Sequence, residues 1–341
     1  MVRRALIAWL LGLSFLGTVS GQSSSPRLTR VVPVRFYQTA KDSPITAVKP
    51  EQFVVKGMPA IVRSIEVDRG PRRIILLLDR SISMNQNRTA GGWQWAVRLA
   101  KAFLALMERE DQVSLNIFAS KLVPVTTFTS DFAAVAKEID ALAPPNSEEA
   151  RKGSGWATHL YDVLPSLLQS FGGDFRFGDS ILIISDGIFP TGSQKIHQTL
   201  ADSGVRVFLI FSTLPDIYSR EYKFGELVKV GQFRPLTVSG EYEHGSSLIW
   251  ETGGGIFDPW KDVLVHPGGF GEYSNEVLFP QTVRAAYQVL KNLYRFEIQL
   301  DAAIEQYKHF DIQLKDEQGK IVKDFLVVHP RYLGPVHAGT K

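Results

Sequence analysis

The 341-residue chain contains no cysteine. This absence excludes disulfide bonds, thiol nucleophiles, cysteine-ligated zinc sites and a lipid anchor on cysteine. Blocks of one charge are also missing, because the formal net charge is only +3 and the lysines and arginines are dispersed. A dispersed charge of this size is typical of a mixed, solvated surface, so we do not expect nucleic acid as a partner. With 44% hydrophobic and 21% charged residues, the composition is that of an ordinary globular protein.

The N-terminal segment predicts the compartment. Arg3 and Arg4 precede an apolar run over 5–19, which ends in small residues. This pattern predicts a removable secretory signal over 1–21. The run is shorter than the roughly 20 apolar residues of a membrane span, although an uncleaved anchor stays open. No later segment is long enough to span, so no stable membrane span is expected after cleavage. A large exported chain without disulfides is typical of a bacterial periplasmic or secreted protein, so we expect it in the bacterial cell envelope.

The next part of the chain predicts a small β unit. A polar, Ser-rich lead-in over 22–30 is followed by short apolar runs from Val31 to Val67, which turn residues interrupt. Runs of this length between turn residues favour strands. The segment 22–70 is therefore predicted to be a lead-in and a small N-terminal β unit, which ends at Gly70-Pro71.

A second β region is predicted at the C-terminal end, over 294–341. The apolar runs 310–314 and 321–328 are joined by the turn sequence DEQGK, a pattern that predicts a β-hairpin. We hypothesise that the N-terminal and C-terminal β pieces pair as one side domain.

Strands and helices alternate between these two β regions. The aliphatic run 74–78 is typical of a strand buried on both faces, and 93–107 carries apolar residues at helical spacing. The same patterns predict strands at 113–118, 181–184 and 205–211, and helices at 131–142, 159–169 and 280–293. This alternation predicts an α/β fold over 71–293, a doubly wound and mostly parallel sheet with helices on both faces. Loops and one short strand-helix unit are expected in 215–273.

A cluster of oxygen donors follows the first strand of this sheet. Asp79, Ser81 and Ser83 form a D-x-S-x-S motif with one carboxylate and two hydroxyls. These hard donors suit Mg²⁺ or Mn²⁺, and Mg²⁺ is usually held by one or two carboxylates. A second loop should therefore supply more oxygen. Thr158, at the start of a predicted helix, and Asp186, directly past a strand end, are the candidates, because ligands of such sheets bind beyond the carboxyl ends of the strands.

The three motifs DRSIS, THLYD and IISDG together resemble the metal-ion-dependent adhesion site of von Willebrand factor type A domains. The resemblance implies a divalent metal, Mg²⁺ with Mn²⁺ or Ca²⁺ as alternatives, on the positions Asp79, Ser81, Ser83, Thr158 and Asp186. In that family the serines and the threonine contact the metal directly, and the aspartates often act through water. One coordination position is left for an acidic residue of a partner protein. Arg80 and Ile82 stand where the family more often has small residues, which affects the rim of the site.

The flanking segments extend the resemblance. The sequence AVKPEQFVVKGMPAIVRSIEV, the motif ETGGGIF at Glu251 to Phe257 and the C-terminal hairpin resemble the exported bacterial VWFA-related proteins described as acidobacterial-type. The likeness thus covers nearly the whole mature chain. It implies a metal-dependent protein-binding module for adhesion or envelope assembly, without enzyme activity, whose partner offers an Asp or Glu carboxylate.

Two other functions stay open at this point. One is a Mg²⁺-dependent, phosphatase-like hydrolase of the haloacid dehalogenase type, with Asp79 as nucleophile. Such sites require a second aspartate two positions on, where this chain has Ser81. The other is a structural or assembly module with a vestigial metal site. The D-x-S-x-S motif taken alone also allows a simpler interpretation, in which an aspartate or serine caps the following helix.

Overall fold

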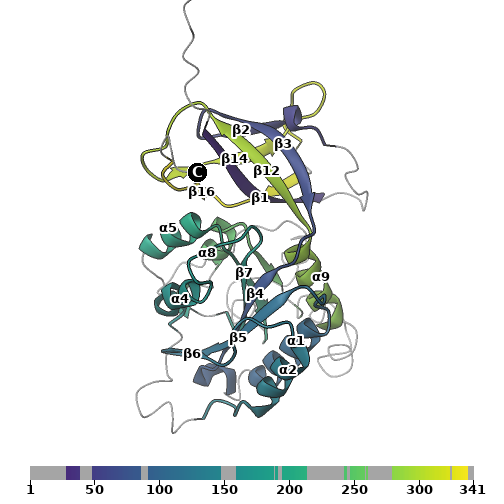
Figure 1. Cartoon of the computed structure of the whole chain (residues 1–341), viewed down its shortest axis with the longest axis vertical. Helices are drawn as coiled ribbons and strands as arrows, with labels where there is room; N and C mark the ends of the chain where they lie inside the picture. Colours follow the sequence, from purple (N-terminus) through teal and green to yellow (C-terminus); the bar gives the residue numbers. More distant parts are fainter. Residues whose placement is uncertain are drawn as a thin grey trace, which may run out of the picture.

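The computed structural model of the chain describes residues 28–38, 48–85, 91–146, 159–187, 189–190, 194–212, 242–243, 246–257, 259, 279–322 and 325–336. The predicted secretory signal, Thr158 and most of 215–273 lie outside the described residues. Figure 1 shows an α/β part and a β part stacked along the long axis of the molecule. In the described residues, no helix is both long enough and apolar enough to cross a membrane.

The α/β part is built on one sheet, which has six strands in the described residues. In chain order these strands are β4 (Arg73–Asp79), β5 (Gln112–Phe118), β6 (Leu122–Pro124), β7 (Ser180–Ser185), β9 (Arg206–Phe211) and β11 (Gly255–Phe257). They lie in the order β11-β9-β7-β4-β5-β6, and all pairs are parallel except β5 with β6. The strand order reverses between β4 and β7. The predicted doubly wound and mostly parallel sheet is thereby confirmed.

Helices cover both faces of this sheet (Figure 1). One face carries α1 (Gly92–Leu104), α2 (Phe132–Ala141) and α9 (Phe279–Lys291), and the other carries α4 (Leu160–Gln169), α5 (Gln194–Ser203) and α8 (Ser246–Glu251). Because both faces are covered, residues 74–78 of β4 are fully buried, as their unbroken aliphatic sequence predicts. Asp131 caps α2, since it accepts a hydrogen bond from the backbone N–H of Ala134 at 2.9 Å.

The β part brings the two ends of the described chain together. Its larger sheet has the order β15-β1-β12-β3, from β15 (Phe325–Val328), β1 (Leu28–Gln38), β12 (Leu293–Leu300) and β3 (Ala60–Asp68). A second pair joins β2 (Phe53–Lys56) and β14 (Asp311–Leu314). All these pairs are antiparallel. The N-terminal and C-terminal β pieces therefore pair as one side domain, as hypothesised, around a core that includes Phe53, Phe296 and Phe310.

Two details of the β part differ from the sequence-based expectations. Residues 28–30, predicted to belong to the lead-in, begin β1, because Leu28 pairs with Leu300 far along the chain. The turn DEQGK forms, with a bond from the N–H of Asp316 to the carbonyl of Lys320 at 2.9 Å. The hairpin begins as predicted, with an antiparallel bridge between Lys315 and Ile321 and a bond from the N–H of Val322 to the carbonyl of Leu314 at 2.9 Å. The longer strands on either side have other partners, since β14 pairs with β2 and β15 pairs with β1. Strands β8 (Phe189–Pro190), β10 (Tyr242–Glu243), β13 (Lys308–His309) and β16 (Tyr332–Leu333) and the 3-10 turns η1 (Pro50–Gln52) and η2 (Ile82–Asn85) complete the described elements.

The ETGGG sequence after α8 is a docking surface for the β part. Arg35 of β1 is buried and donates from Nη2 to the carbonyls of Gly253, at 3.2 Å, and Gly254, at 2.5 Å. The N–H of Arg331 donates to the carbonyl of Glu251 at 2.8 Å. The otherwise orphaned carbonyls after the helix thus find donors in the other part of the molecule.

A buried histidine stands next to this junction. His329 donates from Nδ1 to the carbonyl of Pro330 at 2.7 Å and accepts at Nε2 from the N–H of Ile312 at 3.0 Å, which is the arrangement of a neutral ring. Burial lowers the pKa of His329, and the charge of Arg331 lowers it further, although Asp311 opposes this. Burial alone would raise the pKa of Asp311, but His329, Gln313 and Arg331 lower it well below its usual value.

Acid should destabilise the protein through these two groups. An unfolded histidine takes up a proton near pH 6.5, whereas folded His329 resists protonation, so its contribution is full above about pH 6.5 and is lost below it. Asp311 adds a further loss below about pH 4, where its carboxyl becomes protonated in the unfolded chain. We expect the midpoint temperature of thermal unfolding to decrease as the pH is lowered from 7.5 to 5, and to decrease less in His329→Gln. His309→Gln, which replaces an exposed histidine, is the control. An equal pH dependence of the midpoint in the two variants would contradict the assignment to His329.

Candidate metal centre

The candidate site lies where the strand order of the sheet reverses. Asp79 is the last residue of β4, and Asp186 directly follows β7, the neighbouring strand. Both carboxylates therefore stand at the carboxyl edge of two adjacent parallel strands, and both are buried, Asp79 at 0% exposure. This is the position at which doubly wound sheets bind ligands. The structure thus brings together two predicted site residues that are 107 positions apart in the sequence.

A tight loop after β4 places the two predicted serines. The N–H of Ser81 donates to Oδ1 of Asp79 at 2.8 Å, which folds the chain back on the carboxylate and leads into η2. The hydroxyl oxygens of Ser81 and Ser83 then lie 2.8 Å apart. The two-residue spacing of the D-x-S-x-S motif therefore gathers one carboxylate and two hydroxyls on the same loop.

Ser185 links the two carboxylates and was missed by the sequence analysis. Its hydroxyl donates to Oδ2 of Asp79 at 2.6 Å, lies 3.4 Å from Oδ1 of Asp186, and accepts from the N–H of Gly187 at 3.0 Å. The available signal was a hydroxyl residue at the end of the aliphatic run ILII, directly before Asp186. Ser185 therefore orients Asp79 without belonging to any of the predicted ligand positions.

The electrostatics of the site favour a cation. Burial raises the pKa of Asp79, and the negative charge of Asp186 raises it further, to about 7, although hydrogen bonds from Ser185 and Ser81 oppose the shift. In the described residues, the hydrogen-bond partners of the Asp79 carboxylate are a backbone N–H and a hydroxyl, and neither is charged. A positive ion between the two carboxylates would remove the repulsion that raises this pKa.

Thr158 lies outside the described residues, but its neighbour His159 is described. His159 is the N-cap residue of α4, and its N–H donates to the carbonyl of Ala119, which directly follows β5, at 3.0 Å. Since β5 is the neighbour of β4 on the other side from β7, α4 begins at the same edge of the sheet as Asp79. The ring of His159 contacts Asp162, in the first turn of α4, through Nδ1 at 3.0 Å.

The donor set fits a hard divalent cation. Carboxylate and hydroxyl oxygens suit Mg²⁺, Mn²⁺ and Ca²⁺, and two carboxylates are the usual number for Mg²⁺. In the described part of the chain, no three His, Asp or Glu side chains gather in a way that would hold a metal ion, and the candidate site itself has two carboxylates beside its serine hydroxyls. The loop after β4 and the loop after β7 therefore form the candidate metal position.

Comparison with known proteins finds likeness at the level of the fold. No family model matches the chain, and no curated protein matches its sequence. An aerotolerance-related membrane protein from Bacteroides fragilis is 18% identical and matches 65% of this chain and 98% of its own, with a TM-score of 0.41. A von Willebrand factor type A protein from Catenulispora acidiphila is 9% identical over 90% of this chain and 74% of its own, with a TM-score of 0.42.

A third solved structure is proximal thread matrix protein 1 from the mussel byssus, with a zinc-occupied metal-ion-dependent adhesion site. It is 16% identical and covers 47% of this chain and 38% of its own, with a TM-score of 0.33. At these scores the likenesses do not bear on the chemistry of the site, which rests on the geometry of Asp79, Asp186 and the serines.

A strand end beside the site ties the loops together. Ser212, directly after β9, donates its N–H to the carbonyl of Ser185 at 2.9 Å, and its hydroxyl contacts Sδ of Met84 in η2 at 3.6 Å. Both Ser212 and Met84 are fully buried. The loop after β4 is thus held against the ends of β7 and β9, so the oxygen donors are positioned before any ligand arrives.

Proposed function

We propose that the chain is an exported protein-binding module of the bacterial envelope, which binds an acidic partner residue through a divalent metal and acts in adhesion or assembly. Asp79, Ser81, Ser83, Thr158 and Asp186 would hold the metal. The observation that carries the proposal is the meeting of Asp79 and Asp186 at the reversal point of the sheet, bridged by Ser185 and next to the paired hydroxyls of Ser81 and Ser83.

The residues of the chain have separate tasks in this proposal. The N–H of Ser81 and the hydroxyl of Ser185 orient the Asp79 carboxylate through one hydrogen bond to each of its oxygens. Ser81 and Ser83 present neutral oxygens, so the site adds no charge beyond that of its two aspartates. When bound, the metal supplies an electrophilic position for a carboxylate of the partner. Two carboxylates at most neutralise a divalent ion, which leaves it attractive to a further anion.

Metal titration tests the proposal directly. Calorimetry of the metal-stripped mature protein is expected to show saturable binding of Mg²⁺ or Mn²⁺ at one site, and Asp79→Ala should abolish it. Asp174→Ala removes an exposed carboxylate outside the site and is expected to leave the titration unchanged. Circular dichroism of Asp79→Ala should show a retained fold. Equal metal binding in Asp79→Ala and Asp174→Ala would contradict the assignment. If the wild-type protein also binds no metal, the module with a vestigial site is favoured.

A hydrolase remains the second candidate, and the geometry does not favour it. The Asp79 carboxylate is fully buried and both of its oxygens accept hydrogen bonds, whereas a nucleophile must reach its substrate. We expect no metal-dependent turnover of p-nitrophenyl phosphate by the mature protein. Turnover that Asp79→Asn abolishes would establish the hydrolase instead.

A further inference from the structure

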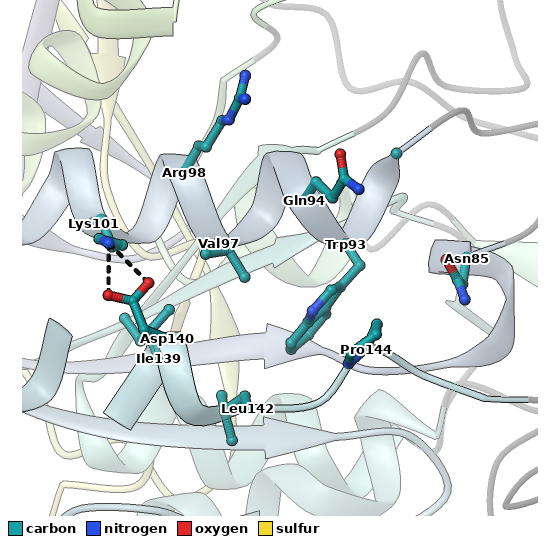
Figure 2. A pocket seen from close by; sticks show the side chains of 11 residues that line it. Asn85, Trp93, Gln94, Val97, Arg98, Lys101, Ile139, Asp140, Leu142 and Pro144 are labelled. Carbon is teal, nitrogen blue, oxygen red and sulfur yellow. Dashed lines mark hydrogen bonds and ion pairs between the residues drawn. The ribbon is translucent and has the colours of Figure 1, made fainter. Parts of the chain in front are cut away.

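A groove of about 820 Å³ lies beside the candidate metal centre, along α1 (Figure 2). Its apolar lining consists of Trp93, Val97, Ile139, Leu142 and Pro144. Figure 2 shows Trp93 and Val97 pointing from α1 toward the segment that follows α2. Volumes of several hundred Å³ are typical of sites that take a ligand, and the lining of this groove combines apolar with polar side chains.

The two ends of the groove differ. One end is closed by an ion pair between Lys101 and Asp140, whose Nζ and Oδ2 atoms lie 2.8 Å apart (Figure 2). The other end is bordered by Asn85, the last residue of η2. Because η2 also contains Ser83, the open end of the groove adjoins the loop that carries the proposed metal ligands.

Two side chains of the metal loop also hold one wall of the groove in place. Arg80 donates from Nε to the carbonyl of Ala143, and Asn85 donates from Nδ2 to the carbonyl of Pro145, both at 2.9 Å. The loop that begins at Asp79 and the wall at 142–145 are therefore one connected surface. The large residue at position 80, which departs from the family pattern in the sequence, has this structural role at the rim.

The charges on the rim favour an acidic ligand. Lys101 and Asp140 neutralise each other. Arg98 is exposed on the rim and stacks over the ring of Trp95 at 4.8 Å, and in the described residues it forms no ion pair with a carboxylate. Arg98 therefore places a positive charge above the apolar floor of the groove.

We infer that this groove binds an extended segment of the partner, in which an apolar side chain lies a few residues from the carboxylate that reaches the metal. The inference rests on the proposed function and names the chemistry of its partner. An extended chain advances about 3.3 Å per residue, so a segment with its acidic residue at the metal passes Asn85 within a few residues and enters the groove. Its apolar side chain is buried against Trp93 and Val97, and any further acidic residue faces Arg98.

Synthetic peptides test the inference. Fluorescein-labelled Ala/Ser decapeptides carry one Asp and one Leu at separations of one to four residues in either direction, beside Asp-only and Asn-plus-Leu peptides. In Mn²⁺, one spacing of Asp and Leu is expected to bind about tenfold or more tightly than the Asp-only peptide, because a leucine side chain becomes buried. Excess chelator should remove this binding. Equal affinity of all Asp peptides at every spacing would overturn the inference and leave the metal-dependent function standing.

Variants in the groove separate its role from that of the metal. Val97→Phe fills the groove and is expected to remove the Leu advantage while Mn²⁺ binding by calorimetry stays unchanged; Val67→Phe, at an exposed valine of β3, is the matched control. Arg98→Glu should weaken peptides with a second Asp, and Arg109→Glu, an exposed arginine outside the groove, should not. A Leu advantage that survives Val97→Phe overturns the inference. So does a dimer in sedimentation that Val97→Phe dissociates, because the occupant would then be a second copy of the chain. If the wild-type protein binds no Mn²⁺, the proposed function itself is contradicted.

Discussion

Gly254→Ala is expected to cost about 4 kcal/mol or more of folding free energy, or to leave no folded protein. A Cβ atom at this position would lie 1.6 Å from the carbonyl oxygen of Val207 and 3.0 Å from that of Ile249. Both are backbone atoms, of β9 and α8, so neither can rotate away. The Gly254 carbonyl also accepts the Arg35 hydrogen bond that docks the β part, so the required shift would disturb both parts of the molecule. Urea unfolding followed by tryptophan fluorescence measures the loss.

The neighbouring glycine provides the control. At Gly255 the nearest atom to an added Cβ is Nη2 of Arg35 at 3.5 Å, which is an ordinary contact. We therefore expect Gly255→Ala to change the free energy of unfolding by less than about 1 kcal/mol. If the two substitutions have similar effects, the close approach of the backbone at Gly254 is not what requires glycine there.

Asp111→Ala is the second substitution with a large expected effect, about 3–5 kcal/mol of lost stability. Asp111 is fully buried and accepts hydrogen bonds from Lys291 Nζ at 2.9 Å, from Tyr287 Oη at 2.7 Å and from the N–H of Arg72 at 2.8 Å. Burial alone would raise the pKa of Asp111, but these donors lower it. Removing the carboxylate leaves the Tyr287 hydroxyl and the N–H of Arg72 without this acceptor, which is costly, while Lys291 keeps its ion pair with Glu108 at 2.8 Å.

The position of this network gives the substitution a wider effect. Arg72 also donates from Nη2 to the carbonyls of Asp68 and Lys291, at 2.8 and 2.7 Å, and so joins the two segments through which the chain crosses between the α/β part and the β part. Asp140→Ala breaks a Lys–Asp pair of the same type, but on the surface, and should cost less than about 1 kcal/mol. Thermal unfolding of both variants by calorimetry makes the comparison. A similar small effect in both would show that Asp111 is not needed to hold the crossing segments.

The central sheet was predictable because its signals are local. The run Ile74 to Leu78 can only be satisfied by a strand covered on both faces, and apolar residues at helical spacing over 93–107 require a helix with a buried face. The candidate site was also predictable from the residue types at strand ends, since Asp79 and Asp186 each follow an aliphatic run. The prediction for Thr158 stays a prediction, as it lies outside the described residues.

The errors arose where a distant part of the chain decides the local structure. Residues 28–30 were predicted to be part of a polar lead-in, because no local pattern reveals that their strand partners are Leu300 and its neighbours. The strands on either side of DEQGK were predicted as one long hairpin because they are adjacent in sequence, but only its base next to the turn forms, and β14 and β15 pair with β2 and β1. Ser185 was missed for a similar reason, since its importance depends on a carboxylate more than 100 positions earlier.

The sequence by itself determined the elements, the alternation of strands and helices, and the oxygen chemistry at the strand ends, because each depends on residues close together in the chain. Only the tertiary structure decided that Arg35 docks on the ETGGG turn, that Ser185 contacts both Asp79 and Asp186, and that a groove adjoins the loop after β4. These features depend on which surfaces meet when the elements pack. Packing joins residues through burial and hydrogen-bond geometry over large separations in sequence, and a single sequence carries no periodicity that encodes it.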